Sequence, residues 1–208
     1  EGAELSLGFA CNGWIAPEEI LTKGNLRPGL GLILTKPLGI GVLFAADMQR
    51  AAKGRWIEAA IASMVQSNQD AVRCLRDHDV QACTDVTGFG LLGHLYEMVG
   101  SATDLAVHLN LEALPVLPGV QTCLELGYLS SLHSRNHQIK RYLTNPQPHR
   151  SAYPLLFDPQ TSGGLLAAVP QDQVNDCLAA LRHRGYGHSR HIGDTVPAAG
   201  QAPFTIKG

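Results

Sequence analysis

A chain of 208 residues with 45% hydrophobic and 16% charged side chains has the composition of a globular protein, which excludes disorder and a fibrous repeat. A formal net charge of −2, with no run of Lys and Arg interleaved with aromatic residues, argues against nucleic acid as a partner. Apolar runs such as residues 39–46 fall far short of the ~20 residues that span a bilayer, so we expect no membrane association.

The amino-terminal half predicts strands followed by helix. Strands are expected at Leu5 to Trp14 and Leu30 to Thr35, a helical turn at residues 17–21, and one helix of about five turns from Trp56 to Leu75, where apolar side chains recur at helical spacing. A short strand at residues 82–87 then enters a glycine-rich loop.

The remaining residues predict further alternation of the two types. Helices are expected at residues 91–99, 121–126 and 172–184, and strands at residues 104–110, 165–169, 189–193 and 204–206. Residues 145–149 read as an exposed, proline-rich loop. The order indicates an α/β fold of the α+β type, with a mixed β-sheet flanked by helices in one domain spanning residues 1–208.

Cysteine usage points to a cytoplasmic protein with reduced, mostly buried thiols. The five cysteines contain no C-x-x-C pair, which argues against a disulfide framework and against a thiolate zinc site; they are Cys11, Cys74, Cys83, Cys123 and Cys177. The chain begins at Glu1 without a basic and apolar leader, so we expect no secretion signal and suspect a piece of a longer protein.

The glycine loop after residue 84 has three interpretations. Its Gly88-x-Gly90-x-x-Gly93 spacing is that of loops that bind a dinucleotide pyrophosphate, and Glu112 stands about where a ribose-binding acid is expected. Asp85 argues for another role, because a carboxylate beside a phosphate-binding loop suits a Mg²⁺–nucleotide site. The loop also reads as a plain helix-starting turn.

Residues 158–164, Asp-Pro-Gln-Thr-Ser-Gly-Gly, form a second candidate. Adjacent glycines after hydroxyl residues can turn successive N–H groups inward to bind an anion, although the same residues suit an ordinary turn before a strand. Lys36 could reach a phosphate or be an exposed loop lysine.

Five segments occur in the order found in one known family. They are residues 34–42 (LTKPLGIGV), 84–95 (TDVTGFGLLGHL), 117–120 (LPGV), 135–136 (RN) and 158–166 (DPQTSGGLL). With these motifs the chain resembles, over nearly its whole length, the selenophosphate synthetases (selenide, water dikinases) of the aminoimidazole-ribonucleotide-synthetase-like superfamily.

The resemblance implies an ATP-dependent enzyme that makes selenophosphate from selenide and releases AMP and phosphate, with Mg²⁺ bridging the nucleotide phosphates. It implies that this chain is the carboxy-terminal domain of a homodimeric enzyme, with residues 1–14 as interdomain junction and first strand. The catalytic residues would then precede Glu1, and we expect the 208 residues alone to be inactive.

Carried over by position, the resemblance assigns Asp85 as a Mg²⁺ ligand. Thr84, Gly163 and Gly164 are candidates for closing the phosphate site. Two alternatives stay open: a dinucleotide-binding oxidoreductase domain that uses Glu112, and a non-catalytic docking domain of a larger fusion.

Overall fold

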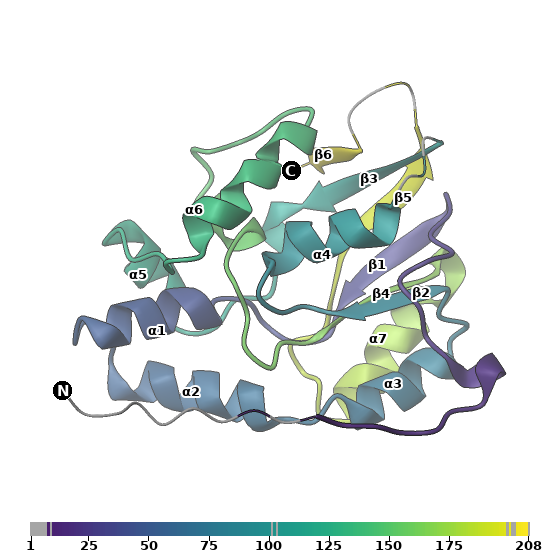
Figure 1. Ribbon diagram of the computed structural model, residues 1–208, viewed down its shortest axis with the longest axis horizontal. Coiled ribbons are helices and arrows are strands. Elements are labelled where there is room, and N and C mark those ends of the chain that lie inside the picture. Colours follow the sequence, from purple (N-terminus) through teal and green to yellow (C-terminus); the bar gives the residue numbers. More distant parts are fainter. Residues whose placement is uncertain are drawn as a thin grey trace.

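A six-stranded mixed sheet forms the centre of the computed structural model, which describes residues 8, 10–100, 102, 104–198, 200 and 203–207 (Figure 1). The strand order is β2-β4-β1-β5-β3-β6, and only the β3–β6 pair is parallel. The strands are β1 (Leu30–Leu34), β2 (Ala82–Asp85), β3 (Leu105–Asn110), β4 (Leu165–Pro170), β5 (Arg190–Pro197) and β6 (Phe204–Lys207). The predicted mixed sheet with flanking helices is confirmed.

Helices cover both faces of the sheet. The α-helices are α1 (Ile40–Met48), α2 (Gly54–Val65), α3 (Gln69–Arg76), α4 (Gly90–Val99), α5 (Val120–Glu125), α6 (His133–Asn136) and α7 (Val174–His183). The 3-10 turns are η1 (Pro17–Glu19), η2 (Leu111–Ala113), η3 (His137–Tyr142), η4 (Tyr153–Leu156) and η5 (Gln171–Gln173). Within the described residues, none of the helices is both long and apolar enough to cross a membrane.

Two hydrophobic cores result, one on each face of the sheet, because successive strand side chains point to opposite faces. Leu32 and Leu34 of β1 pack into the larger core with α1, α2, α4 and α5. Ile33 between them packs into the smaller core with α3 and α7. Figure 1 shows α3 and α7 together on one side of the sheet and α4 on the other.

The single helix predicted from Trp56 to Leu75 is wrong, since the chain breaks between α2 and α3. The Ser67 hydroxyl accepts a hydrogen bond from the Gln69 N–H, and the Asn68 side chain donates to the Gly163 carbonyl at 3.0 Å. Such side chains compete with helical hydrogen bonds. The break directs Trp56 into the larger core and Leu75 into the smaller one, so apolar spacing continues across two different helices.

Two other sequence expectations need correction. Part of the strand predicted at Leu5 to Trp14 lies outside the described residues, and residues 10–14 form no strand but an extended, exposed segment in which Trp14 is fully exposed. Helix α1 had no prediction, because a segment that is apolar on nearly every side lacks an amphipathic period. The loop predicted at residues 145–149 is confirmed.

Candidate functional site

Asp85 ends β2, an edge strand, and its side chain is exposed. The hydroxyl of half-buried Thr84 donates to the Asp85 backbone carbonyl at 3.4 Å. A groove of about 560 Å³ lies beside both residues and is also lined by Thr22 and Lys23. Among the described residues, no donor or basic side chain lies within bonding distance of the Asp85 carboxylate. The carboxylate is therefore available to a ligand.

Two segments distant in sequence, residues 86–90 and 158–164, meet at this end of β2; we call them the joined loops. The Val86 N–H donates to the Gly164 carbonyl at 2.9 Å, and the Gln160 N–H donates to the Thr87 carbonyl at 3.0 Å. The Asn136 side chain at the end of α6 reaches the same place, donating to the Gly88 carbonyl at 2.8 Å. The two motifs therefore build one structure beside Asp85.

Packing explains why residues 163 and 164 are both glycine. A Cβ on Gly163 would overlap the Val86 carbonyl oxygen, and a Cβ on Gly164 would lie 2.5 Å from the Lys36 backbone nitrogen. Both glycines are buried and let the joined loops come into contact. A direct contact of either glycine with phosphate stays a prediction.

Lys36 is buried rather than an exposed loop residue. Its ammonium group donates to the Gln66 carbonyl at 2.6 Å and to the Ser162 carbonyl at 3.1 Å, and burial lowers its pKa. The side chain thus fastens residues 158–164 to the break between α2 and α3.

His94 holds the turn that follows Asp85. The Thr87 N–H donates to His94 Nε2 at 3.0 Å, so this nitrogen carries no proton and the ring proton lies on Nδ1, 3.3 Å from the Glu97 carboxylate. Gly90 adopts a φ of 72°, and a Cβ at this position would lie 2.9 Å from the Phe157 backbone carbonyl carbon. The glycine loop is therefore shaped by contacts within the protein.

Asp158 and Gln160 cap the start of α1. The Gln160 Oε1 atom accepts hydrogen bonds from the N–H groups of Gly39 and Ile40, each at 3.3 Å. The Asp158 Oδ2 atom accepts from the Gly41 N–H at 3.2 Å and from the Gln160 side chain at 2.9 Å. Burial raises the pKa of Asp158 to about 7, against the opposing effect of these hydrogen bonds.

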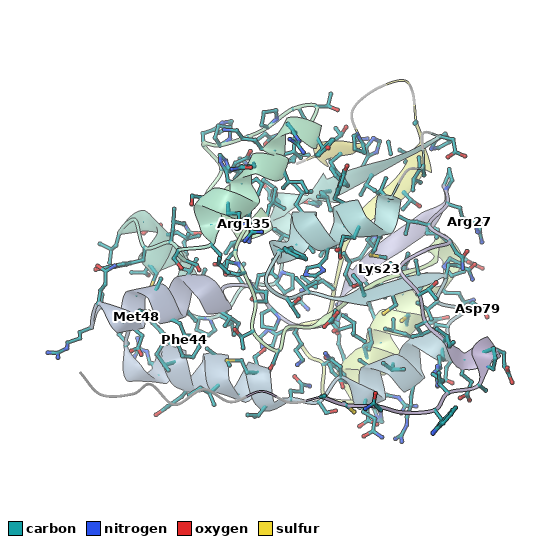
Figure 2. The ribbon with its side chains drawn as sticks, viewed as in Figure 1. Lys23, Arg27, Phe44, Met48, Asp79 and Arg135 are labelled. Carbon is teal, nitrogen blue, oxygen red and sulfur yellow. The ribbon has the colours of Figure 1, made fainter. Side chains whose placement is uncertain are left out.

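A larger hollow of about 610 Å³ lies between α1 and residues 129–132. Phe44 and Met48 of α1, both labelled in Figure 2, line one side, and Gly88 and Thr161 of the joined loops line another. The joined loops therefore border open space on this side as well.

The oxygen ligands that this chain offers near Asp85 suit Mg²⁺ but form only part of a site. Proteins usually bind Mg²⁺ through one or two carboxylates, and phosphate oxygens and water complete the octahedron. Asp85 offers one exposed carboxylate, and in the part of the chain that the structure describes it belongs to no cluster of three ligand groups. Any further ligands must come from a nucleotide, from water or from another polypeptide segment.

The dinucleotide interpretation is wrong for this topology. A dinucleotide-binding loop joins adjacent parallel strands, with the ribose-binding acid at the end of the second strand. Among the described strands, β2 pairs only with antiparallel β4, whereas β3, which precedes Glu112, lies at the far side of the sheet. Glu112 instead forms an ion pair with Arg150 at 2.6 Å.

These features define a domain with a mixed sheet between two helical layers and a two-loop site at the end of an edge strand. The family model described as AIR synthase related protein, C-terminal domain, matches residues 27–204. The chain therefore belongs to this family.

Curated relatives point to one branch of it. A selenide, water dikinase of Pelobacter propionicus is 37% identical over 198 residues, which cover 94% of this chain and 57% of that protein. A selenide, water dikinase of Escherichia coli K12 is 38% identical over 200 residues, which cover 96% of this chain and 57% of the relative. The chain thus spans little more than half the length of these proteins.

Solved structures share the fold at lower identity. The hydrogenase maturation protein HypE aligns with a TM-score of 0.66 at 19% identity, over 89% of this chain and 51% of that one. A HypE solved in complex with ATP aligns with a TM-score of 0.59 at 17% identity, over 92% of this chain and 51% of that one.

Sequence reasoning missed several residues that build the site. Asn136 and Gln160 lie inside the motifs, but neither received a role, and His94 was not placed in the core or on the surface. The position of all three residues inside the family motifs was the available signal that they take part in the site. Asn136 and Gln160 bond to backbone groups 48 and 121 residues away, which local patterns do not reveal, whereas His94 bonds to Thr87 seven residues earlier.

Proposed function

We propose that this chain supplies one wall of the Mg²⁺–ATP site of a selenide, water dikinase, with Asp85 as a ligand of the metal ion. The observation that carries the proposal is the unpaired, exposed Asp85 carboxylate at the end of β2, next to the joined loops. The identity of more than a third with selenide, water dikinases supports this reaction, and a HypE of the same fold solved with ATP supports ATP as the nucleotide.

In this proposal selenide, ATP and water are converted to selenophosphate, AMP and phosphate, and a Mg²⁺ ion held by Asp85 would supply positive charge beside the nucleotide phosphates. Asp85 holds the metal from the carboxy-terminal side, and Thr84, Gly163 and Gly164 close the wall around the phosphates. The joined loops keep the carboxylate in place, because each loop is hydrogen-bonded to the other.

The other walls, the catalytic nucleophile and the pairing of two subunits belong to the rest of the enzyme. Cys83, adjacent to the site, is unsuited to be the nucleophile, since burial, followed by the charge of Asp85, raises its pKa to about 12. We further propose a cytoplasmic, homodimeric enzyme, and expect the isolated 208 residues to form no AMP from ATP and selenide.

The test is Asp85→Asn in the full-length protein that carries this chain. We expect the rate of AMP formation at limiting Mg²⁺ to fall about 100-fold or more, with partial recovery at high Mg²⁺, because one metal ligand is lost. Unfolding temperature should be unchanged, since the side chain is exposed and unpaired.

The matched control is Asp79→Asn, an exposed aspartate labelled in Figure 2. Its backbone has a φ of 53°, a conformation that asparagine also tolerates. Its activity should equal that of the unmodified protein. Full activity of Asp85→Asn at limiting Mg²⁺ would contradict the assignment and favour a docking role for the chain.

A further inference from the structure

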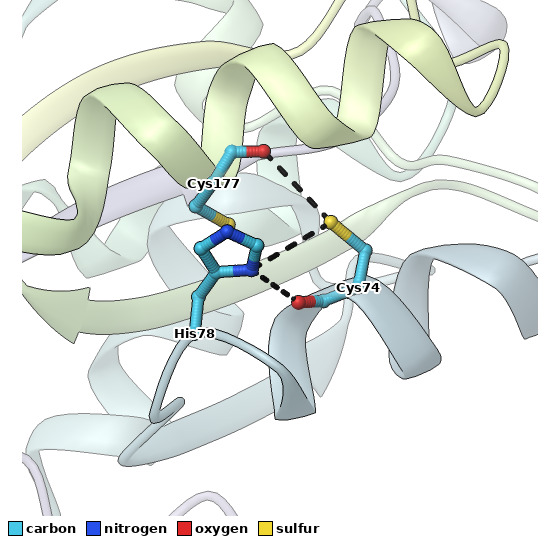
Figure 3. A group of neighbouring side chains, drawn as sticks. All are labelled: Cys74, His78 and Cys177. Carbon is cyan, nitrogen blue, oxygen red and sulfur yellow. Dashed lines mark hydrogen bonds between the residues drawn. The ribbon is translucent and has the colours of Figure 1, made fainter.

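A cluster of soft metal-binding groups lies between α3 and α7, in the smaller core. Figure 3 shows Cys74 on α3, His78 in the turn after it, and Cys177 on α7, with their side chains directed toward one another. Both cysteines are completely buried and His78 is half-buried. Their three ligand atoms all lie within 4.8 Å of one another, the only such group of three among the described residues.

The distances are close to those of a metal site. Tetrahedral Zn²⁺ with Zn–S bonds of about 2.3 Å and Zn–N bonds of about 2.0 Å places its ligand atoms about 3.5–3.8 Å apart. The Cys74 Sγ atom is 4.0 Å from His78 Nδ1. Small side-chain rotations would therefore bring the three atoms around one ion.

Metal binding by the His78 imidazole would replace one hydrogen bond. His78 Nδ1 lies 2.7 Å from the Cys74 carbonyl oxygen, to which it donates a hydrogen bond. Binding an ion through Nδ1 moves the ring proton to Nε2. Because His78 is half-buried, water can reach this side of the cluster, both to accept a hydrogen bond from the Nε2–H group and to occupy a fourth coordination position.

Both thiols must lose their protons to bind the ion, because the thiolate is the metal ligand. The two protons pass to water, which reaches the cluster at half-buried His78. The charge of the bound cation offsets that of the two buried thiolates.

We propose that Cys74, His78 and Cys177 bind one thiophilic d¹⁰ metal ion, of which Zn²⁺ is the representative. The sequence argued against a thiolate zinc site for lack of a C-x-x-C pair, but α3 and α7 bring together cysteines 103 residues apart. Among the described residues, α3 and α7 otherwise meet through apolar packing, the weak Cys74 thiol contact to α7 and the Asp77–Arg184 ion pair at 3.7 Å just beyond their ends. The role of the ion is to fasten this layer of the fold.

The test uses the reduced, chelator-treated 208-residue chain carrying Cys11→Ser, which removes the one exposed thiol. Titration with Zn²⁺ should show one tight site per chain, and Co²⁺ should give the absorption bands of thiolate coordination. His78→Gln and Cys177→Ser should each weaken Zn²⁺ binding by more than about tenfold. Cys123→Ser, which removes a buried thiol from the other core, should leave affinity unchanged.

Thermal unfolding provides a second measurement that does not depend on the cysteine variants folding well. Saturating Zn²⁺ should raise the unfolding temperature of the parent chain but not that of His78→Gln, since a ligand stabilises the state it binds. Equal stabilisation of both proteins, or Zn²⁺ affinity unaffected by His78→Gln and Cys177→Ser, would overturn the proposal.

Discussion

Asp158 makes the stability of this domain depend on pH in a predictable direction. Its carboxyl is fully buried at the start of α1, and burial raises its pKa from 3.8 to about 7. The folded state therefore favours the protonated acid, while the unfolded chain ionises near 3.8. The stabilisation is complete below pH 3.8 and is lost as the pH rises toward 7.

The magnitude follows from the two pKa values. One pKa unit corresponds to about 1.4 kcal/mol, so a rise from 3.8 to about 7 corresponds to at most about 4 kcal/mol of unfolding free energy. Roughly 2–3 kcal/mol of this falls between pH 5 and pH 8. Asp158→Asn keeps an acceptor for the Gly41 N–H but cannot ionise. The variant should therefore not lose unfolding free energy from this site as the pH rises.

The assay is urea unfolding of the parent chain and of Asp158→Asn at several values between pH 5 and pH 8. The difference in unfolding free energy should shift by about 2–3 kcal/mol in favour of the asparagine variant as the pH rises. Exposed Asp172→Asn serves as the control and should follow the parent profile. A difference between Asp158→Asn and the parent that stays constant over this range would refute the reasoning.

Two other predictions concern the joined loops. Gly163→Ala should lower the unfolding free energy by about 2–4 kcal/mol, because its Cβ overlaps the Val86 carbonyl and separates the loops. Urea unfolding measures this loss. Gly54→Ala, whose Cβ meets nothing within 4 Å, should be neutral or slightly stabilising in the same assay, and equal effects of the two substitutions would contradict this account. His94→Ala leaves the Thr87 N–H without its acceptor and should cost about 2–4 kcal/mol in urea unfolding; a loss below about 0.5 kcal/mol would show that the histidine does not hold the turn.

Sequence alone predicted the strands well where their signal is local. Apolar runs bounded by glycine or proline located β1 and β4, and the pattern before the glycine loop located β2. It failed for α1, whose amino terminus is capped by side chains from residues 158 and 160, more than 115 residues away. It also joined α2 and α3, because apolar spacing does not reveal that two helices face different cores.

The sequence also predicted only part of the candidate site. Asp85 was predicted as a metal ligand from its position before the glycines, since a carboxylate beside a phosphate-binding loop has a recognisable chemistry, and the structure shows its carboxylate exposed at the end of β2. The glycines themselves misled when read as a dinucleotide loop, because spacing carries no information about strand order. Only the antiparallel pairing of β2 with β4 excludes that interpretation.

The sequence by itself determined the family, the alternation of strands and helices, and the carboxylate at the end of β2, because each depends on residues close together in the chain. The tertiary structure decided that residues 86–90 and 158–164 form one unit, that Asp158 is buried at a helix terminus, and that Cys74, His78 and Cys177 converge. These features arise from contacts between segments about 75 to 120 residues apart. Such contacts are selected by the packing of whole helices and strands, and local sequence patterns do not encode which segments will meet.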